Sequence, residues 1–376
     1  MSARRWAEQD VFMSSLSIVV VTYRRERVLI DTIEALLRLD CDDKEILVID
    51  QSPVHEPEIE ARLVEFAAVR AVRHIRVDTP NIPAAMNLGL RLAKARAVMF
   101  VDDDVRPSPD LAHAHLAAHR AGRASLIAGR VIQPWGEDRG TFDAAPRSAN
   151  DDSERSAIGL NRNSLPQETL GVSLGEANDL AAIESLLPER LRRRLGLLRR
   201  FAPHNNVSGD SRNADRSRFM DSSESYFLHD FIGCNFSVDR EVALQIGGFD
   251  ENFARAAYQF EAEFAYRLIK AGHRISYEPH ALLYHLKSPD GGTRAFSDHL
   301  RTARPDHAVG EYYCLLRTWR GWPSLRAMAG RPFKAIATRH HLRSPWWIPV
   351  TLIGEIRAAS WAISLALRGP KLAPPC

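Results

Sequence analysis

The first 135 residues alternate short runs of aliphatic, β-branched residues with longer segments of helical periodicity. The runs predict four strands, at residues 16–23, 45–50, 72–77 and 97–102. The first strand leads into a helical segment whose apolar side holds Val28, Ile33, Leu36 and Leu37, and further helices are expected at 56–70, 84–95 and 109–120. Such alternation is typical of βαβ units, and an unbroken Val/Ile run is typical of a strand covered on both faces. The sequence therefore predicts an α/β fold with a mainly parallel central sheet.

The residues that follow these strands are the first candidates for function, because parallel sheets bind ligands beyond the carboxyl ends of their strands. The first strand runs into Tyr23 and Arg24, the second ends in Asp50, and the fourth is followed by an acidic triplet, Asp102-Asp103-Asp104. Three carboxylates beside a buried strand are costly to desolvate unless a cation relieves their repulsion. Oxygen clusters of this kind suit hard ions such as Mg²⁺ or Mn²⁺. A solvated acidic turn before the next helix is the alternative.

Composition narrows the class of protein. The 376 residues contain 50 Lys and Arg against 47 Asp and Glu, a net charge of +3, whereas nucleic-acid binders usually carry a marked basic excess. We therefore expect no nucleic-acid partner. The four cysteines are far apart and form no CxxC pair, which argues against a disulfide framework and indicates a reducing, cytoplasmic environment.

Beyond residue 135 the character of the chain changes twice. Residues 140–225 are rich in Ser, Asn, Asp and Arg with weak apolar periodicity, which predicts a long, partly disordered insertion. Its arginine-rich segment 179–201 favours a helix that is either simply solvated or a basic surface for phosphates. From residue 227 the pattern is again that of a folded domain, with a strand at 227–238, helices near 240–246 and 259–271, and two strands in HRISYEP and HALLYHL.

Five segments, taken in order, resemble the family 2 glycosyltransferases: the strand ending in Thr-Tyr-Arg, the strand ending in Ile-Asp, the DDD triplet, GCNFSVDREVALQIGGFDENF, and EFAYRLIKAGHRISYEPHALLYH. The resemblance implies a GT-A-type nucleotide-diphospho-sugar transferase fold with a catalytic domain over 15–286, in which 1–135 forms the nucleotide-binding half and 227–286 the acceptor half, plus a helical C-terminal region. It implies inverting transfer of a hexosyl or deoxyhexosyl group from a nucleotide-sugar donor to a hydroxyl of a cell-surface polysaccharide or glycolipid. Mg²⁺ or Mn²⁺ is the implied cofactor.

The resemblance also implies roles for individual residues on the donor side. Asp104 matches the metal ligand of the family's DxD motif, and Asp102 and His285 complete the metal site. The nucleotide sugar is expected to contact residues from four segments: Thr22, Tyr23, Arg24, Asp50, Asn87, Asp102 and Asp103. The family often has a basic residue before the loop at 81–89, whereas this chain has Thr79-Pro80, so one expected phosphate contact has no counterpart.

On the acceptor side, Gly233, Asn235 and Asp250 match segments that lie near the transferred sugar or the acceptor in the family. Glu261 stands where the family has a catalytic Asp, and inverting transfer needs a base there to remove the acceptor hydroxyl proton. The longer Glu side chain moves its carboxylate by roughly 1 Å, a displacement that matters for rate. Two alternatives stay open: Glu261 is only a surface acid at a helix start, or Asp250 or Glu251 supplies the base.

Two other functions compete with this interpretation. A non-catalytic nucleotide-sugar-binding or scaffold protein of glycan assembly would keep the donor site without turnover, and Phe260-Glu261 in place of the family's Glu-Asp favours it. A nucleotidyltransferase that makes sugar nucleotides needs a Gly-rich, basic loop after the first strand, and TYRRERV contains no glycine.

The C-terminal region, residues 311–376, is basic and rich in tryptophan. It carries ten Lys or Arg against two acids, and five of the seven Trp, so the near balance of the whole chain conceals an acidic body and a basic end. This mixture is typical of helices lying on an anionic membrane surface; the alternative is a helical pair packed on the catalytic domain. No signal segment opens the chain, and its most apolar stretch, 345–367, is broken by Glu355 and Arg357. We expect a cytoplasmic protein, peripheral on the inner face of the plasma membrane, whose oligomeric state the sequence leaves open.

Overall fold

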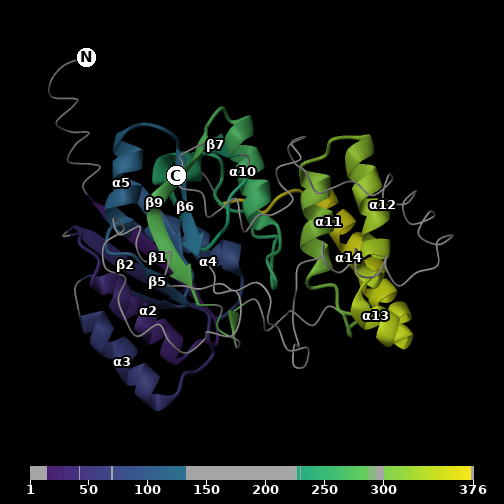
Figure 1. The fold of residues 1–376 in the computed structure, drawn as a ribbon, viewed down its shortest axis with the longest axis horizontal. Coiled ribbons are helices and arrows are strands. Elements are labelled where there is room, and N and C mark those ends of the chain that lie inside the picture. Colours follow the sequence, from purple (N-terminus) through teal and green to yellow (C-terminus); the bar gives the residue numbers. More distant parts are fainter. Residues whose placement is uncertain are drawn as a thin grey trace, which may run out of the picture.

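Figure 1 shows the fold in a computed structural model, which describes residues 15–132 and 227–373 apart from 42, 69–70, 229, 287, 289–290 and 293–299. A central sheet covered by helices forms one part of the molecule, and a group of C-terminal helices lies beside it. The predicted insertion at 140–225, with its arginine-rich segment 179–201, lies outside the described residues.

The N-terminal half of the sheet is parallel. Four strands stand in the order β3-β2-β1-β4 with every pairing parallel: β1 (Leu16–Thr22), β2 (Lys44–Asp50), β3 (Val72–Arg76) and β4 (Ala97–Val101). The helices between them are α2 (Arg27–Leu37), α3 (Pro57–Ala68) and α4 (Ile82–Leu92). The predicted strands and helices of this half are confirmed. The buried side of α2 is shifted, however, to Leu29, Ile30, Ile33 and Leu36, whereas Val28 and Leu37 are only half-buried.

The second half of the sheet is mixed, which corrects the expectation of a mainly parallel sheet throughout. Five further strands build it: β5 (Val105–Pro107), β6 (Leu126–Ile132), β7 (Phe227–Leu228), β8 (Asn235–Asp239) and β9 (Ile275–His285). β8 lies antiparallel between β4 and β6, and β6 pairs parallel with β9. The two predicted strands HRISYEP and HALLYHL are one strand, because a register shift opposite Gly129 and Arg130 accommodates Pro279 within β9.

Alternate residues of the parallel strands contribute to two hydrophobic cores, one on each face of the sheet. Ile18 and Val20 pack in the core that contains residues of α2, α3 and α5 (Leu111–Arg120). Val19 and Phe100 pack in the core that contains residues of α4, α9 (Arg240–Gln245) and α10 (Phe260–Lys270). Because successive side chains of a strand point to opposite faces, two cores require an unbroken apolar run, as the sequence has.

The C-terminal region forms four α-helices and one 3₁₀ turn among the described residues: α11 (Ala308–Arg317), α12 (Trp322–Ile336), α13 (Arg339–Arg343), η4 (Pro345–Trp347) and α14 (Ile348–Arg368). α14 packs against α11 and α12, with Ala358 and Ala362 fully buried. Between these helices, the hydroxyl of Tyr312 donates to Glu355 at 2.9 Å, and Arg331 lies 3.6 Å from the same carboxylate. The C-terminal helices are therefore a folded unit with a buried polar network.

One helical segment among the described residues, Pro345–Arg368, has the length and mean hydropathy to cross a membrane. Of its most apolar window, 33% is buried inside the protein. The segment reaches this mean hydropathy although it contains two charged residues, Glu355 and Arg357. Composition alone therefore does not distinguish a spanning helix from one that lies on a surface.

Candidate active site

The carboxyl ends of β1, β4 and β9 meet around a pocket of about 680 Å³, its open mouth included. Six residues singled out from the sequence line it: Thr22, Tyr23, Asp102, Asp103, Asp104 and His285. Eight others line it as well: Val21, Arg25, Gln51, Pro80, Asn81, Ile82, Arg255 and Gly292. The acidic triplet and the end of the first strand therefore face one cavity, as expected from parallel strands whose carboxyl ends share an edge of the sheet.

The middle acid of the triplet, Asp103, is turned into the protein. Its carboxylate accepts a hydrogen bond from Thr22 Oγ1 at 2.7 Å and lies 3.3 Å from Nε of Arg25. Burial raises the pKa of Asp103 to about 7, and repulsion from Asp104 adds to this, although the charge of Arg25 opposes it. Asp103 thus fixes the end of β1 and the position of Arg25.

Asp104 faces the end of β9. Its Oδ1 lies 3.0 Å from Nε2 of His285, and its Oδ2 accepts the backbone N–H of Ser288 at 2.7 Å and lies 3.4 Å from Nη2 of Arg25. Burial alone would raise the pKa of Asp104, but His285, Arg25 and the Ser288 N–H together hold it below its usual value. Asp104 is therefore a carboxylate that keeps its charge although it is buried.

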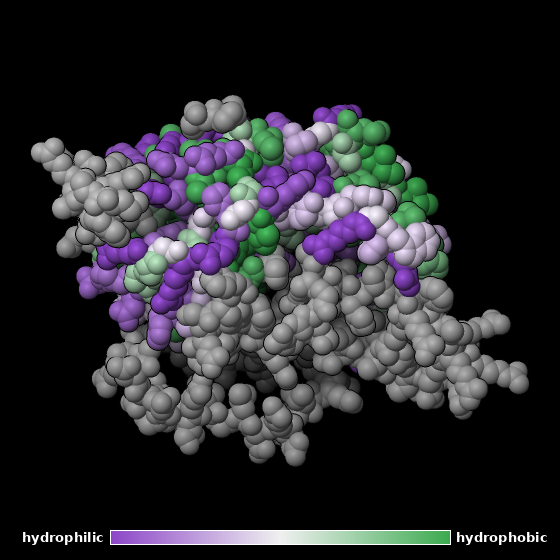
Figure 2. Space-filling model, turned by 90° about the horizontal axis from the view of Figure 1, so that it is seen from above, coloured by the Kyte–Doolittle hydropathy of each residue, from purple (hydrophilic) through white to green (hydrophobic). Residues whose placement is uncertain are grey.

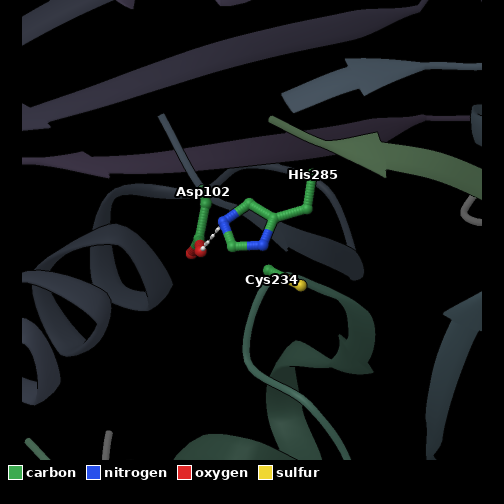
Figure 3. A group of neighbouring side chains, drawn as sticks. All are labelled: Asp102, Cys234 and His285. Atoms are coloured by element: carbon green, nitrogen blue, oxygen red, sulfur yellow. Dashed lines mark ion pairs between the residues drawn. The ribbon is translucent and has the colours of Figure 1, made fainter. Parts of the chain in front are cut away.

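Figure 3 shows Asp102, His285 and Cys234 converging from the end of β4, the end of β9 and the turn before β8. One ligand atom of each lies within 4.8 Å of the others, and Asp102 Oδ2 is 3.4 Å from His285 Nε2. Burial raises the pKa of the Cys234 thiol, and so do three nearby carboxylates: Asp102, Asp104 and Glu261. A thiol held in its protonated form is a poor metal ligand. The residues best able to hold a metal are therefore the predicted Asp102, Asp104 and His285.

The spacing of these atoms suits a hard divalent ion. An octahedral ion with bonds of about 2.1 Å holds neighbouring ligand atoms about 3.0 Å apart. Asp104 Oδ1 and His285 Nε2 have this separation, 3.0 Å. Two atoms with lone pairs this close need a proton or a cation between them, so the donor set fits Mg²⁺ or Mn²⁺.

Asp50 is not among the residues that line the pocket, and its predicted contact with the nucleotide base stays a prediction. Its carboxylate is fully buried. It accepts the N–H of Ser52 at 2.8 Å, and its Oδ2 lies 2.8 Å from Nε2 of His55 and 2.9 Å from Nε2 of His74. Burial alone would raise the pKa of Asp50, but these hydrogen bonds outweigh it and hold the pKa well below its usual range. Asp50 positions the loop after β2, from which Gln51 lines the pocket.

The arginine that lines the pocket at the end of β1 is Arg25, not the predicted Arg24. Arg24 has a left-handed backbone (φ 52°), and its exposed guanidinium lies over the ring of Tyr23. This backbone conformation turns the chain after β1, and the next side chain, Arg25, is buried against Asp103. The turn thus directs the second arginine of TYRR toward the pocket, and the predicted donor contact of Arg24 stays a prediction.

Asn87 and Asn235 are buried and bind backbone groups of the fold, and their predicted roles in donor and acceptor binding stay predictions. Asn87 accepts the backbone N–H of Phe249 at 2.7 Å and donates to its carbonyl at 2.8 Å. Asn235 donates to the carbonyls of Arg130 and Ala281 at 2.9 and 2.8 Å. Both side chains satisfy backbone groups that would otherwise be buried without a partner, and so they join distant segments of the fold.

Asp250 has structural contacts as well, and its predicted place beside the acceptor stays a prediction. It is buried and accepts hydrogen bonds from the hydroxyl of Tyr313 at 2.7 Å and the backbone N–H of Lys371 at 2.9 Å. The neighbouring Glu251 lies 3.0 Å from Nζ of Lys371. These two acids tie the catalytic domain to the C-terminal region, which argues against either of them as the base.

Glu261 lies beside Gly233, as the predicted acceptor site requires. A Cβ at position 233 would be 2.7 Å from Glu261 Oε1, so glycine keeps this space open. Glu263, in the same first turn of α10, is instead buried against Arg267 at 2.8 Å. Since the charge of Glu261 also acts on the thiol of Cys234, the glutamate stands next to the candidate metal ligands.

The sequence analysis missed three of the residues that line the pocket. Arg25 and Gln51 adjoin residues that were named, and only the turn after each strand decides which side chain faces inward. Arg255 belongs to no motif and follows a loop that sequence periodicity does not describe. Its left-handed backbone (φ 62°) is unusual for a residue other than glycine and gives no signal in the sequence.

Comparison with known proteins agrees with this geometry. Residues 17–163 match the family model described as glycosyl transferase family 2. Chondroitin synthase of Escherichia coli is 30% identical over 107 residues, a match that covers 28% of this chain and 15% of that protein. The chain therefore corresponds to a minor part of that relative.

Solved structures match over almost the whole chain. The crystal structure of GalNAc-T7 with UDP, GalNAc and Mn²⁺ aligns with a TM-score of 0.53 and 14% identity, over 94% of this chain and 56% of that one. The mannosyltransferase PcManGT from Pyrobaculum calidifontis, in complex with GDP-Man and Mn²⁺, aligns with a TM-score of 0.45 and 16% identity, over 94% and 79%. The first of these matches confirms the expected GT-A-type fold.

Proposed function

We propose that this chain, which carries a glycosyl transferase family 2 domain over residues 17–163, transfers a hexosyl or deoxyhexosyl group from a nucleotide sugar to an acceptor hydroxyl with inversion. The observation that carries the proposal is the pocket in which Asp102, Asp104 and His285 converge beside Glu261. The Mn²⁺-bound nucleotide and nucleotide-sugar complexes among the structural matches belong to those proteins, and they agree with the donor class proposed for this one.

The donor is held by the pocket and by a divalent cation. Asp104 and His285 would hold Mg²⁺ or Mn²⁺ together with Asp102, which is the half-exposed member of the set. Such an ion would supply positive charge beside the diphosphate leaving group. Arg25 is paired with Asp103 and Asp104 and so lowers the negative charge of the pocket wall. Without such compensation, three acids would repel a diphosphate.

Glu261 is proposed as the base. Inverting transfer is a single displacement in which the acceptor oxygen attacks the anomeric carbon opposite the leaving group, while a base removes the hydroxyl proton. Glu261 opens α10 next to Gly233, and no side chain at 233 blocks its carboxylate. The acids that could replace it, Asp250 and Glu251, are bound to the C-terminal region.

The acceptor is proposed to be a cell-surface glycan or a glycolipid reached from an anionic membrane surface. The two acids of the C-terminal region face inward, since Glu311 and Glu355 both pair with Arg331. Its exposed charged residues, among those described, are basic: Arg320, Lys334, Arg339, Arg343, Arg357, Arg368 and Lys371. Its exposed large apolar residues are Trp319, Trp322, Leu325, Phe333, Leu342, Trp346, Ile353, Ile356, Ile363 and Leu367.

This combination supports a helix that lies on the membrane rather than one that crosses it. α14 packs against α11 and α12, buries Gly354, Ala358 and Ala362, and exposes Ile356 and Leu367. In Figure 2, hydrophobic residues gather at the end of the molecule formed by the C-terminal helices, beside hydrophilic ones. Cations and apolar side chains on one surface complement anionic lipid.

The experiment that tests the proposed function is a transfer assay with a panel of nucleotide sugars, Mn²⁺ and lipid-linked or oligosaccharide acceptors. We expect one donor to give a glycosylated product whose anomeric configuration is inverted, as determined by NMR. Nucleotide-sugar binding without transfer to any acceptor, and without any effect of Glu261→Gln, would instead identify the non-catalytic scaffold protein.

A further inference from the structure

Two arginines line the donor pocket, and their side chains differ in exposure to solvent. The side chain of Arg25 is only 7% exposed and is held between Asp103 and Asp104. The side chain of Arg255 is 49% exposed. A diphosphate entering the pocket therefore meets Arg255 as the accessible guanidinium among the described lining residues.

Arg255 lies in a loop whose backbone conformation is unfavourable for L-residues unless other parts of the protein hold it. Three non-glycine residues within five positions have left-handed φ angles: Arg255 (62°), Ala257 (48°) and Gln259 (71°). L-residues rarely adopt this conformation, and it persists where surrounding structure holds it, often beside a site of function. This loop, residues 254–259, leads directly into α10 and Glu261.

The loop at 254–259 is held by contacts with the C-terminal helices and the residues just before them. These lie outside the range 17–163 that matches the family model. The guanidinium of Arg255 pairs with Asp306 and lies 5.5 Å from the ring of Trp361 in α14. The ring of Tyr258 stacks on that of His307, with centroids 4.5 Å apart.

The loop also approaches α11 so closely that a side chain there would not fit. A Cβ at Gly310 would be 2.2 Å from the carbonyl oxygen of Tyr258. Gly310 is thus the point at which α11 sets the position of the loop.

We propose that Arg255 binds the diphosphate of the donor and of the nucleoside diphosphate product, and that the C-terminal helices are the part of the protein that positions it. The inference rests on the proposed function, because it assigns a ligand to the same pocket. A guanidinium presents several N–H donors in a plane, so it can bind phosphate while one edge stays paired with Asp306. Thr79-Pro80 lacks the basic residue that the family often has there, and Arg255, which lines the same pocket as Pro80, supplies that phosphate contact.

The test is calorimetric titration of the full chain with UDP, GDP and dTDP in Mn²⁺, and with the corresponding monophosphates. Arg255→Gln is expected to weaken diphosphate binding by about tenfold or more and to leave monophosphate binding within about twofold, since a charged hydrogen bond is lost only to the outer phosphate. Arg255→Lys keeps the positive charge but lacks the planar guanidinium, so its diphosphate affinity should lie between that of the wild type and that of Arg255→Gln. Arg91→Gln, near the far end of α4, is the matched control and should bind like the wild type.

Substitutions within the C-terminal helices test whether these helices position Arg255. Gly310→Ala forces the Tyr258 carbonyl to move and should weaken diphosphate binding more than monophosphate binding. Gly330→Ala in α12, where no atom lies within 4 Å of the added Cβ, is its control. Thermal melts of each variant establish that it is folded.

The outcomes separate the two proposals. If the wild type binds no nucleoside diphosphate in Mn²⁺, the proposed function fails and this inference with it. The proposed function stands, but the assignment of Arg255 is overturned, in either of two cases. In the first, Arg255→Gln binds diphosphates as tightly as the wild type does. In the second, Arg255→Gln loses affinity for diphosphates and monophosphates to the same extent. Unchanged binding by Gly310→Ala overturns the positioning role of α11.

Discussion

Asp104 and His285 lie 3.0 Å apart because the three-residue strand β5, directly after the acidic triplet, pairs with the end of β9, with Val105 opposite His285. The backbone N–H of Leu286 also donates to the carbonyl of Asp104 at 2.8 Å. Main-chain hydrogen bonds therefore fix the two side chains, one at the start of β5 and the other at the end of the neighbouring strand β9. Such preorganisation favours metal binding, since little entropy is lost when the ion binds.

The first prediction concerns the metal site. Asp104→Asn and His285→Gln should each abolish the increase in nucleoside diphosphate affinity that Mn²⁺ produces, because each removes a ligand from the pair. Calorimetry with and without Mn²⁺ measures the effect, and Asp31→Asn on the exposed side of α2 is the control. A Mn²⁺ dependence that survives in both variants would contradict the assignment.

The second prediction concerns the base. Glu261→Gln should lower kcat by about 10²–10⁴-fold, the usual contribution of a general base, with donor affinity changed by less than about twofold. Gly233→Ala should lower kcat as well, because its methyl group would occupy the space before Glu261 Oε1. Glu241→Gln, an exposed acid in the first turn of α9, should leave kcat unchanged. Equal kcat for Glu261→Gln and the wild type would rule out this base.

The third prediction concerns the membrane. The full chain should sediment with vesicles that contain anionic lipid and be released by high salt, since exposed charge pairs are screened by ions. The double variant Ile356→Ser/Leu367→Ser should bind less, and Val54→Ser/Val64→Ser, on equally exposed apolar residues of the catalytic domain, should bind normally. Sedimentation that neither salt nor the α14 substitutions reduce would argue for a spanning helix instead.

The fourth prediction concerns stability at acid pH. Ser237 Oγ lies 2.8 Å from both His115 Nδ1 and His119 Nε2, and burial lowers the pKa of each histidine to about 4. Between pH 6.5 and about 4 the unfolded chain binds protons that the folded chain excludes, so the free energy of unfolding falls as pH falls through this range.

Urea unfolding at pH 7.5 and pH 5 measures this loss. His119→Gln should reduce the difference between the two pH values, although Asp239 and Arg96 also act on the imidazole of this residue. His113→Gln, on the exposed side of the same helix, should show the wild-type difference. If the free energy of unfolding of His119→Gln falls between pH 7.5 and pH 5 by as much as that of the wild type, groups other than His119 cause the loss of stability at acid pH.

The fifth prediction separates a structural role from a catalytic one at Asp250. Asp250→Asn should lower the free energy of unfolding by about 1–3 kcal/mol, because it disturbs three hydrogen bonds to a buried carboxylate and its attraction to nearby Arg317. Tyr313→Phe should have a smaller effect in the same direction, about 1 kcal/mol. If instead Asp250→Asn retains stability and loses acceptor binding, the original interpretation of this residue as an acceptor contact is supported.

The parallel half of the fold could be predicted from the sequence because apolar runs such as LSIVVVTY are a direct consequence of burial on two faces. The triplet and His285 could be located because strand ends share an edge. The mixed half could not, since the direction of β8 depends on long-range pairing with β4 that no local pattern records.

The site was predicted less completely for a physical reason. Motif residues such as Asp50, Asn87 and Asn235 are polar because they satisfy buried groups of the fold, and a sequence motif does not distinguish this from ligand binding. Conversely, Arg255 enters the pocket through a left-handed backbone held by Asp306 and Trp361, which are distant in sequence.

The pairing of β6 and β7 with the same strand has a consequence for how this chain can vary. The chain leaves the sheet after Ile132, which stands opposite Tyr284 of β9, and it returns at Phe227, which stands opposite Ser276 of β9. The two points are held by one strand, while Asp102, Asp104 and His285 are fixed by β4, β5 and β9. The number of residues between Ile132 and Phe227 can therefore change without a change in the strands that carry the donor site.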